Sequence, residues 1–407
     1  MRTLILTFGT RGDVQPYVAL GVGLRAAGHA VTIATTDEFE SLVAGHGLTF
    51  ARLRGDFLKL AQASDGQRPN LLKLLPQWIA MARDTLDDEW RAAQSAEVLI
   101  YNPSAFGGEH IAAKLQAPAF AAFPAPLYTP TRAFPSPFFP FARLGPFNRA
   151  SHRLLTVMAT AIYGRPIREW RRDVLGLPPA RGETLVRGRP IPMLYSFSEA
   201  VVPRPADWPA HVTITGYWFL DAPPAWEPPS DLVAFLEAGP PPVYVGFGSM
   251  FMAGGAGLTR IVLDALARTG QRAVIATGWG GLTAEAAPDC IHFVADAPHD
   301  WVFPRVAAVV HHGGAGTTAA GLRAGRPTLI CPVVGDQTFW GRRVAALGAG
   351  PAPLSNARLT PERLAAALTQ AAGDPAMRER AAAVGQRLQA EDGLARAIEV
   401  IHANLNP

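Results

Sequence analysis

Two stretches that lie far apart in the chain contain the residue types and spacings expected of a chemical site. The later one is HHGGAGTT, from His311 to Thr318, which follows an apolar run and opens an expected helix at about Gly316 to Ala324. The free N–H groups and dipole of a helix N-terminus attract phosphate, and glycines let the backbone approach a ligand. The ring N–H of His311 and the hydroxyls of Thr317 and Thr318 add donors. This stretch therefore predicts a phosphate-binding loop.

A pair of polar residues follows the next apolar run, from Pro327 to Cys331. The loop after this run ends in Asp336 and Gln337, whose carboxylate and amide groups can bind the hydroxyls of a sugar. A glycine-rich strand-to-helix turn also occurs without any ligand, and this is the alternative. Two histidines, three glycines and two threonines at one helix start, followed by an Asp-Gln pair, favour ligand binding.

The earlier stretch is GTRGDVQP, from Gly9 to Pro16, which follows the apolar run ending at Phe8. Its one carboxylate is Asp13, which either caps a helix expected to start near Pro16 or acts as a general base that takes a proton from a hydroxyl. An aspartate with an ordinary pKa of about 3.9 is a weak base at neutral pH, and pairing with Arg11 would lower that pKa further. The base role therefore requires a partly desolvated site.

Both stretches lie at the ends of buried strands within repeated strand–helix–strand units. The first unit runs from Leu4 to Ala34, and the pattern starts again with the apolar runs at Val243–Phe247 and Ala273–Thr277. Such units form doubly wound parallel sheets, whose ligands bind beyond the carboxyl ends of the strands. The sequence therefore predicts an α/β fold with a site where the two loops meet.

A segment rich in proline and tryptophan divides the chain into two parts. We expect an N-terminal domain at 1–203, a stiff linker at 204–229 and a C-terminal domain at 230–390, followed by a last helix within 391–407. A chain of 407 residues suits two domains, and 49% hydrophobic with 17% charged residues indicates a globular protein.

The bulk composition excludes several classes of protein. The net charge is +4 without a run of basic residues, so no nucleic-acid partner is expected. Cys290 and Cys331 are expected to be small core residues in or beside buried strands. The sequence has no signal-peptide pattern and no uncharged apolar run of about 18 residues free of proline, so we expect a cytoplasmic protein without stable membrane insertion.

The HHGGAGTT loop and the Asp-Gln pair, followed by Arg343-Val344, resemble the nucleotide-sugar binding block of family 1 glycosyltransferases. The bacterial natural-product and sterol-type enzymes are the most similar branch, whereas plant members carry HCGWNS in place of residues 311–316. The resemblance extends in order and length over nearly the whole chain. It implies the GT-B fold, in which two doubly wound Rossmann-like domains with parallel sheets face each other across a cleft. It also implies that the helix within 391–407 crosses back to the N-terminal domain.

The resemblance further implies roles for single residues. Asp13 is then the catalytic base, and His311 helps to stabilise the leaving diphosphate. Plant members have a catalytic histidine at the position of Asp13, whereas bacterial relatives supply an aspartate from an RGD-like loop. Asp336 is a rival base, because it lies on the cleft side of its sheet. The implied donor-binding residues are Ser249, Ala297, Pro298, His311, Gly313, Gly314, Ala315, Gly316, Thr317, Asp336 and Gln337.

The acceptor site is expected in the N-terminal domain. The segment from Pro124 to Phe147 is dense in proline and phenylalanine, and so apolar a loop must be covered by the protein or by a ligand. From Phe57 to Trp90 we expect two or three amphipathic helices, interrupted at Pro69 and Pro76, which either pack on the core or line the acceptor pocket. The expected acceptor-binding residues are Thr10, Arg11, Asp13, Trp78, Phe134 and Phe138.

The activity implied is an inverting, metal-independent transfer of a hexose from a UDP- or dTDP-sugar to a hydroxyl of an apolar acceptor of the sterol, polyketide, macrolactone or flavonoid type. The nucleotide-sugar is a co-substrate, and no cofactor is expected. Metal-dependent glycosyltransferases commonly use two aspartates two positions apart, a spacing that no two aspartates here have. The alternatives are a nucleotide-sugar epimerase of the same fold and a non-catalytic helper protein. A dinucleotide-binding reductase is disfavoured, because GTRGDVQP is not a G-x-G-x-x-G fingerprint.

Overall fold

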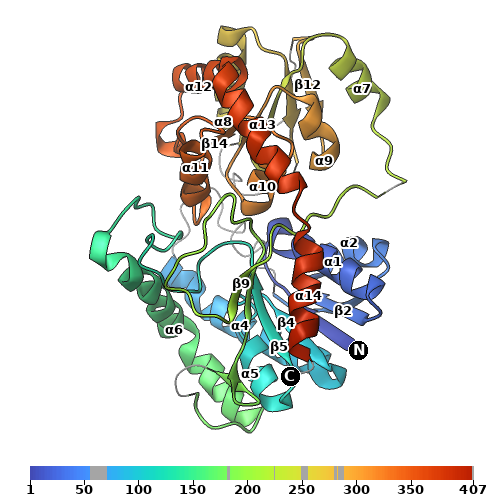
Figure 1. Ribbon diagram of the computed structural model, residues 1–407, viewed down its shortest axis with the longest axis vertical. Coiled ribbons are helices and arrows are strands. Elements are labelled where there is room, and N and C mark those ends of the chain that lie inside the picture. The colour runs from blue at the N-terminus through green and yellow to red at the C-terminus, as the bar shows by residue number, and fades with distance from the viewer. Residues whose placement is uncertain are drawn as a thin grey trace.

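The computed structural model describes residues 1–55, 71–180, 184–223, 225–248, 255–278, 282 and 288–405, with the backbone alone described at 71–78 and 255–256. Within these ranges two parallel β-sheets form two lobes, one drawn above the other in Figure 1, with helices packed around each sheet. The expected α/β class with two doubly wound, Rossmann-like parallel sheets is confirmed.

The first sheet has the strand order β3-β2-β1-β4-β5-β8-β9, and all its pairs are parallel. Its central strands are apolar runs buried on both faces, as expected for a parallel sheet covered by helices. Leu6 at the end of β1 lies beside Ala34 of β2 and Tyr101 of β4, so the loops after these strands emerge at one edge. The strands are β1 (Arg2–Leu6), β2 (Ala30–Thr35), β3 (Thr49–Arg52), β4 (Val98–Tyr101), β5 (Ala119–Phe123), β8 (Met193–Tyr195) and β9 (Val212–Ile214).

The second sheet has the order β12-β11-β10-β13-β14, again with parallel pairs. Gly246 at the end of β10 pairs with His311 at the end of β13, so the glycine-rich loop starts at the carboxyl edge of this sheet. The strands are β10 (Val243–Gly246), β11 (Ala273–Ala276), β12 (Ile291–Val294), β13 (Ala308–His311) and β14 (Thr328–Ile330). A separate antiparallel pair joins β6 (Leu185–Val186) to β7 (Arg189–Pro190).

Two helix predictions for the N-terminal half were wrong in their bounds. Helix α1 begins at Arg11 and not near Pro16, because Thr10 and Asp13 satisfy donors at its start. One continuous helix, α4, passes through Pro76, where a break was expected, whereas Pro69 lies outside the described residues. Helix α6 likewise contains Pro166. The helices are α1 (Arg11–Ala26), α2 (Glu40–Gly45), α4 (Leu71–Ala92), α5 (Gly108–Leu115) and α6 (Asn148–Asp173).

The C-terminal half surrounds its sheet with shorter helices. They are α7 (Ser230–Glu237), α8 (Gly255–Thr269), α9 (His299–Val302), α10 (Ala315–Arg323), α11 (Gln337–Ala346), α12 (Pro361–Gly373) and α13 (Pro375–Gln389). The last helix, α14 (Gly393–Leu405), lies beside α1 in the lower lobe of Figure 1. Ala397 and Ile401 of α14 share a buried cluster with Val14 and Val18 of α1, so the end of the chain packs on the first lobe.

The two lobes also share a hydrophobic cluster of their own. Phe197 and Trp208 from the first half pack there with Trp340 of α11 and Leu388 of α13, and the Arg343 side chain donates to the Val201 carbonyl oxygen at 2.6 and 2.8 Å. The segment 204–229, expected to be a linker, contributes β9 to the first sheet before it crosses to the second. The domain boundaries themselves stay a prediction.

Two further expectations concern the burial of the cysteines and the presence of membrane-spanning helices. Cys331 is buried as expected, but Cys290 is exposed, because it precedes β12 at the edge of the second sheet. None of the helices in the described part of the chain has the length and apolar character that a membrane crossing requires.

Candidate active site

Asp13 lies in the first turn of α1, and its carboxylate turns back over the start of that helix. Its Oδ2 accepts hydrogen bonds from the backbone N–H and the hydroxyl of Thr10, at 2.8 and 2.9 Å. Gly9 has φ of +135°, and a Cβ at this position would overlap the Asp13 carboxylate. The capping role and a catalytic role are therefore compatible, because the same contacts that stabilise the helix start also orient the carboxylate.

The environment of Asp13 is desolvated, as the base role requires. Burial raises the pKa of Asp13, while the two hydrogen bonds from Thr10 oppose this shift. Pairing with Arg11 would have lowered the pKa, but Arg11 pairs with Asp296 of the second lobe, at 2.8 Å between Nη1 and Oδ2. Asp13 is therefore a stronger base than an exposed aspartate.

A second carboxylate, Asp336, comes from the loop before α11 in the other lobe. Its Oδ2 accepts a hydrogen bond from the indole N–H of Trp340 at 2.8 Å. Burial, with a smaller contribution from the charge of Asp13, raises the pKa of Asp336 to about 6, while the hydrogen bond from Trp340 opposes this shift. The charge of Asp13 also adds to the burial that raises the pKa values of Tyr17 and Tyr128. The tertiary structure therefore brings both candidate bases into one electrostatic environment.

His311 ends β13 and is fully buried. Its Nδ1 accepts a hydrogen bond from the N–H of Gly313 at 3.0 Å, so the ring proton of the neutral imidazole lies on Nε2. Burial lowers the pKa of His311 well below its ordinary value, and the neighbouring His312 adds to this shift. The Nε2 atom is buried without a hydrogen-bond partner in the described part of the chain. His311 is thus a neutral donor with an unused N–H.

The glycines after His311 have separate structural reasons. Gly313 has φ of +99°, and a Cβ there would lie 2.6 Å from Cγ2 of Ile330. A Cβ on Gly314 would lie 2.7 Å from Nε2 of His312, whereas a Cβ on Gly316 would meet only open space. Steric crowding therefore requires the first two glycines, and Gly316 leaves the start of α10 accessible.

The remaining residues expected to bind the donor differ in which of their hydrogen-bonding groups are already used within the protein. The hydroxyl of Thr318 donates to the Gly314 carbonyl oxygen at 2.9 Å, whereas Thr317 is half-buried on the same turn. The Oε1 of Gln337 accepts from the N–H groups of residues 333 and 334, at 2.7 and 3.0 Å, which leaves its amide N–H₂ for a ligand. Ala297 is buried and Pro298 directly precedes α9, while Ser249 lies outside the described residues.

The expected acceptor residues are not all in one place. Phe134 is half-buried and packs against Phe339 of α11, with 5.4 Å between ring centroids. Phe138 is 42% exposed, and Phe141 and Phe147 are more exposed still, so the rest of the protein does not cover this part of the loop, and its cover by a ligand stays a prediction. The side chain of Trp78 lies outside the described residues.

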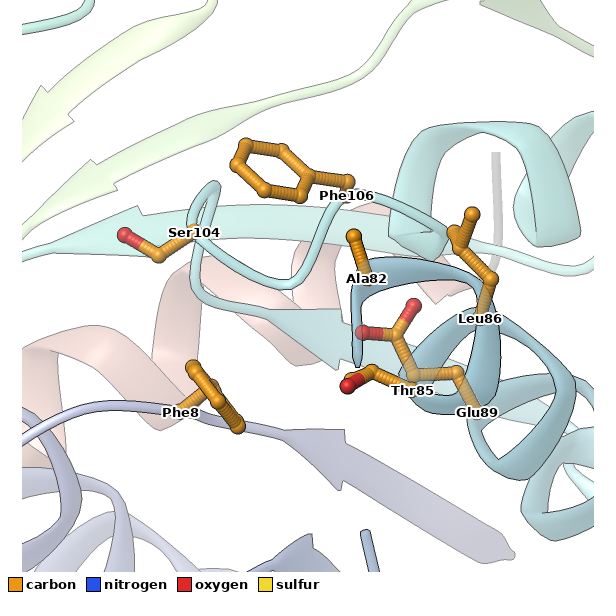
Figure 2. Close-up of a pocket in the computed structure, with 7 residues that line it drawn as sticks. All are labelled: Phe8, Ala82, Thr85, Leu86, Glu89, Ser104 and Phe106. Carbon is orange, nitrogen blue, oxygen red and sulfur yellow. The ribbon is translucent and has the colours of Figure 1, made fainter. Parts of the chain in front are cut away.

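Sequence reasoning missed Glu89, a fully buried carboxyl group on α4. It lines a pocket near the end of β1, shown in Figure 2, and burial raises its pKa to about 8. The signal was present in the helical spacing, because Ala82, Leu86 and Ala93 occupy the same buried face. A carboxylate on such a face is uncommon, and this could have singled it out.

Comparison with known protein families gives two matches, one in each half of the chain. Residues 3–135 match the glycosyltransferase family 28 N-terminal domain. Residues 250–400 match the C-terminal domain of the erythromycin biosynthesis protein CIII-like family.

Two relatives from fungi are sterol glucosyltransferases. A sterol 3-beta-glucosyltransferase of Cryptococcus neoformans var. neoformans serotype D (strain JEC21 / ATCC MYA-565) is 38% identical over the whole chain, and one of Emericella nidulans is 40% identical. The chain spans only 27% and 30% of the lengths of these two relatives.

Solved structures resemble this one in fold. The glycotransferase of kitacinnamycin has a TM-score of 0.74 at 20% identity, with 99% of this chain and 98% of that chain covered. The glycosyltransferase VinC in complex with dTDP has a TM-score of 0.69 at 22% identity, with 100% and 99% covered.

Proposed function

The chain belongs to the family 1 glycosyltransferases with the GT-B fold, and from this premise we propose that it transfers a hexose from a nucleoside-diphosphate sugar to a hydroxyl group of a sterol-type acceptor. The observation that carries the proposal is the Nε2–H of His311, which has no partner among the described residues and lies beside the open start of α10. A buried donor without a partner is costly unless a ligand uses it, and a diphosphate is the ligand that a helix N-terminus favours. The names of the fungal relatives supply the sterol class.

In the proposed reaction Asp13 removes the proton from the acceptor hydroxyl. The acceptor oxygen forms its bond to the anomeric carbon while the bond from that carbon to the diphosphate oxygen breaks, which inverts the anomeric centre. The raised pKa of Asp13 and its fixed orientation by Thr10 support this role. A base whose pKa is nearer to the working pH accepts a proton more effectively than an ordinary aspartate.

The departing diphosphate gains negative charge, which the second lobe is arranged to stabilise. The Nε2–H of His311, the backbone N–H groups of Ala315 and Gly316 and the hydroxyl of Thr317 are the proposed donors. Because these groups supply positive potential at the phosphates, we propose that transfer needs no metal ion. UDP and dTDP are the nucleotides to test first.

The transferred sugar is proposed to lie between the lobes, with its hydroxyls bound by Asp336 and by the amide N–H₂ of Gln337. Trp340 occupies only one oxygen of Asp336, which leaves the other for a sugar hydroxyl. Asp13 is preferred over Asp336 as the base, because Asp13 comes from the lobe proposed to hold the acceptor, whereas Asp336 comes from the lobe proposed to hold the donor.

The test is thermal unfolding with UDP, dTDP, UDP-glucose or NAD, followed by transfer assays with sterols. A ligand at about a hundredfold its Kd stabilises the fold by about 2.7 kcal/mol. Stabilisation by UDP or dTDP, and sugar transfer to a sterol, are the expected results. Stabilisation by NAD alone, or turnover of the donor without any acceptor, would instead indicate a reductase or an epimerase.

A further inference from the structure

A pocket lies between α4 and the loops after β1 and β4, at the carboxyl edge of the first sheet. Its enclosed space is only about 10 Å³, room for one water-sized group, and about 220 Å³ is reached only when the open solvent in front of it is included. Figure 2 shows Phe8 and Phe106 on opposite sides, with Thr85, Glu89 and Ser104 between them. The pocket is therefore mainly apolar but contains two hydroxyls and one carboxyl group.

The pocket and Asp13 lie at the same edge of the first sheet. Phe8 follows β1 and stands only a few residues before Asp13, and Ser104 follows β4, which pairs with β1. The Ser104 hydroxyl lies 3.5 Å from that of Tyr128, whose pKa is affected by the charge of Asp13. A ligand with its hydroxyl at Asp13 can thus extend toward this pocket along the same edge of the sheet.

Glu89 is only half satisfied by the protein. Its Oε2 accepts a hydrogen bond from the N–H of Gly107 at 2.8 Å, and a Cβ at Gly107 would overlap this carboxyl group. Its Oε1 is buried without a hydrogen-bond partner in the described part of the chain. The hydrogen bond to Gly107 gives Oε2 a structural role. It gives no such role to Oε1.

No cation neutralises Glu89 within the described residues, since the charged groups on the surrounding elements are engaged elsewhere. On α4, Asp88 is bound by Arg54 and Arg91, and Asp87 accepts a hydrogen bond from Trp170. On α6, Glu169 pairs with Arg83 and Arg165. On α5, Glu109 lies beside His110 and Thr184. Burial, with a smaller contribution from the charge of Asp88, raises the pKa of Glu89 to about 8. Glu89 is therefore a neutral carboxylic acid at pH 7, and its proton lies on Oε1 because Oε2 accepts from Gly107.

We propose that Glu89 donates a hydrogen bond from Oε1 to a second oxygen of the acceptor, a carbonyl or hydroxyl group remote from the hydroxyl that receives the sugar. Because the enclosed space admits only a water-sized group, one oxygen of the acceptor enters it, and Glu89 selects molecules with an oxygen at this end. An acceptor that lacks this oxygen would leave the buried acid unpaired, which disfavours its binding. This inference rests on the proposed glycosyl transfer and adds a specificity-determining residue to it.

Two substitutions separate this role from the structural one. Glu89→Gln keeps an oxygen for Gly107 and an N–H donor for the acceptor but does not titrate. Glu89→Met has a similar size and provides neither group. Asp84→Asn, an exposed position on the same helix, is the matched control. A purely structural role would change stability or the rate with every acceptor alike.

The experiment compares two sterols that share the glycosylated hydroxyl, one with a ketone on the far ring and the other with a methylene. We expect wild type and Asp84→Asn to favour the ketone by about tenfold in kcat/KM at neutral pH, equivalent to one well-formed hydrogen bond. This preference should disappear as the pH rises through about 8, because the ionised acid no longer donates. Glu89→Gln should keep the preference at every pH, and Glu89→Met should lack it throughout.

The inference is overturned if wild type does not distinguish the two sterols, or if Glu89→Gln behaves like Glu89→Met. If neither sterol accepts a sugar from UDP or dTDP donors, the proposed acceptor class is wrong. Calorimetric binding of the same two sterols then decides the inference independently, because equal affinities for wild type would overturn it.

Discussion

Arg11 and Asp296 form an ion pair between the two lobes, with Nη1 of Arg11 2.8 Å from Oδ2 of Asp296. This contact joins the start of α1 to the loop after β12, and among the described residues it leaves Asp13 without a cationic partner, despite its position two residues from Arg11. Both side chains are largely exposed, so the pair contributes less than about 1 kcal/mol to stability.

Arg11→Met should therefore leave the acid limb of the pH–rate profile where it is in wild type. If Arg11 paired with Asp13 in solution, its removal would raise the pKa of Asp13 and move that limb to higher pH. The measurement is kcat/KM for sugar transfer across the acid range, with Asp296→Asn as the matched variant that breaks the same ion pair from the other lobe.

Asp13→Asn should reduce kcat by about 10²–10⁴-fold, because the variant cannot accept the acceptor proton. The thermal shift caused by UDP or dTDP should stay as in wild type, since Asp13 is assigned to the acceptor and not to the phosphates. The Asn side chain still accepts the Thr10 hydrogen bonds, so the fold should be retained. Near-normal turnover in this variant would contradict the base assignment and favour Asp336.

Asp336→Asn should stabilise the free protein at neutral pH. The pKa of Asp336 is about 6 in the folded protein, above its ordinary value of 3.8. The contribution of Asp336 to the free energy of unfolding is therefore most favourable below pH 3.8 and is lost as the pH rises through about 6. Above about pH 6 the wild-type protein contains a charged, buried carboxylate that the variant lacks. The expected result is a higher Tm than wild type at pH 7.5.

The same comparison made near pH 4 should give no gain in Tm, because Asp336 is then neutral in the folded protein. The variant should also lose sugar transfer if the Asp336 carboxylate binds a sugar hydroxyl. A variant that gains stability at neutral pH but transfers sugar normally would support the pKa assignment and refute the binding role.

His311→Ala should abolish the stabilisation by UDP or dTDP and lower the transfer rate by about 10²-fold or more, the usual effect of removing a donor to a developing anion. Since the pKa of His311 is lowered, its donor is neutral, and UDP binding should not weaken as the pH rises through the ordinary histidine range. His311→Gln keeps a side-chain N–H and should recover part of the stabilisation. Full UDP stabilisation of the alanine variant would place the phosphates elsewhere.

Chelation with EDTA should leave the transfer rate unchanged, and added Mg²⁺ or Mn²⁺ should not raise it. Among the described residues, no group of three or more histidine, cysteine, aspartate or glutamate side chains is arranged to hold a metal ion. The check is an assay with purified, EDTA-treated protein against a metal-supplemented sample. A rate that falls with EDTA and recovers with one of these ions would show that a metal contributes to diphosphate departure.

The fold class and the two key loops could be predicted from the sequence because their signals are local. Apolar runs such as Leu4–Leu6 specify buried parallel strands, and the Gly313–Gly314 pair meets backbone and packing constraints at the turn that contains it. Asp13 could be selected for the same reason, as the one carboxylate in a loop at the carboxyl end of a strand.

Helix continuity and exposure were decided by tertiary packing. Pro76 and Pro166 lie within continuous helices, and α4 and α6 pack against each other, so neighbouring elements override the local preference for a break. The sequence left open whether the protein or a ligand covers the loop around Phe138, and the structure leaves Phe138 exposed, because burial depends on which distant segments pass over a loop.

The protonation states could not be predicted from the sequence. Arg11 is near Asp13 in the chain but pairs with Asp296. The pKa of Asp336 is affected by a charge from the other lobe, and Glu89 lies on a buried helix face without a cation near it among the described residues. A pKa depends on desolvation and on charges within a few ångströms, and these are set by segments that are distant in sequence. The sequence by itself therefore determined which groups are present and on which elements, whereas the tertiary structure decided which of them are paired, neutral or available to a ligand.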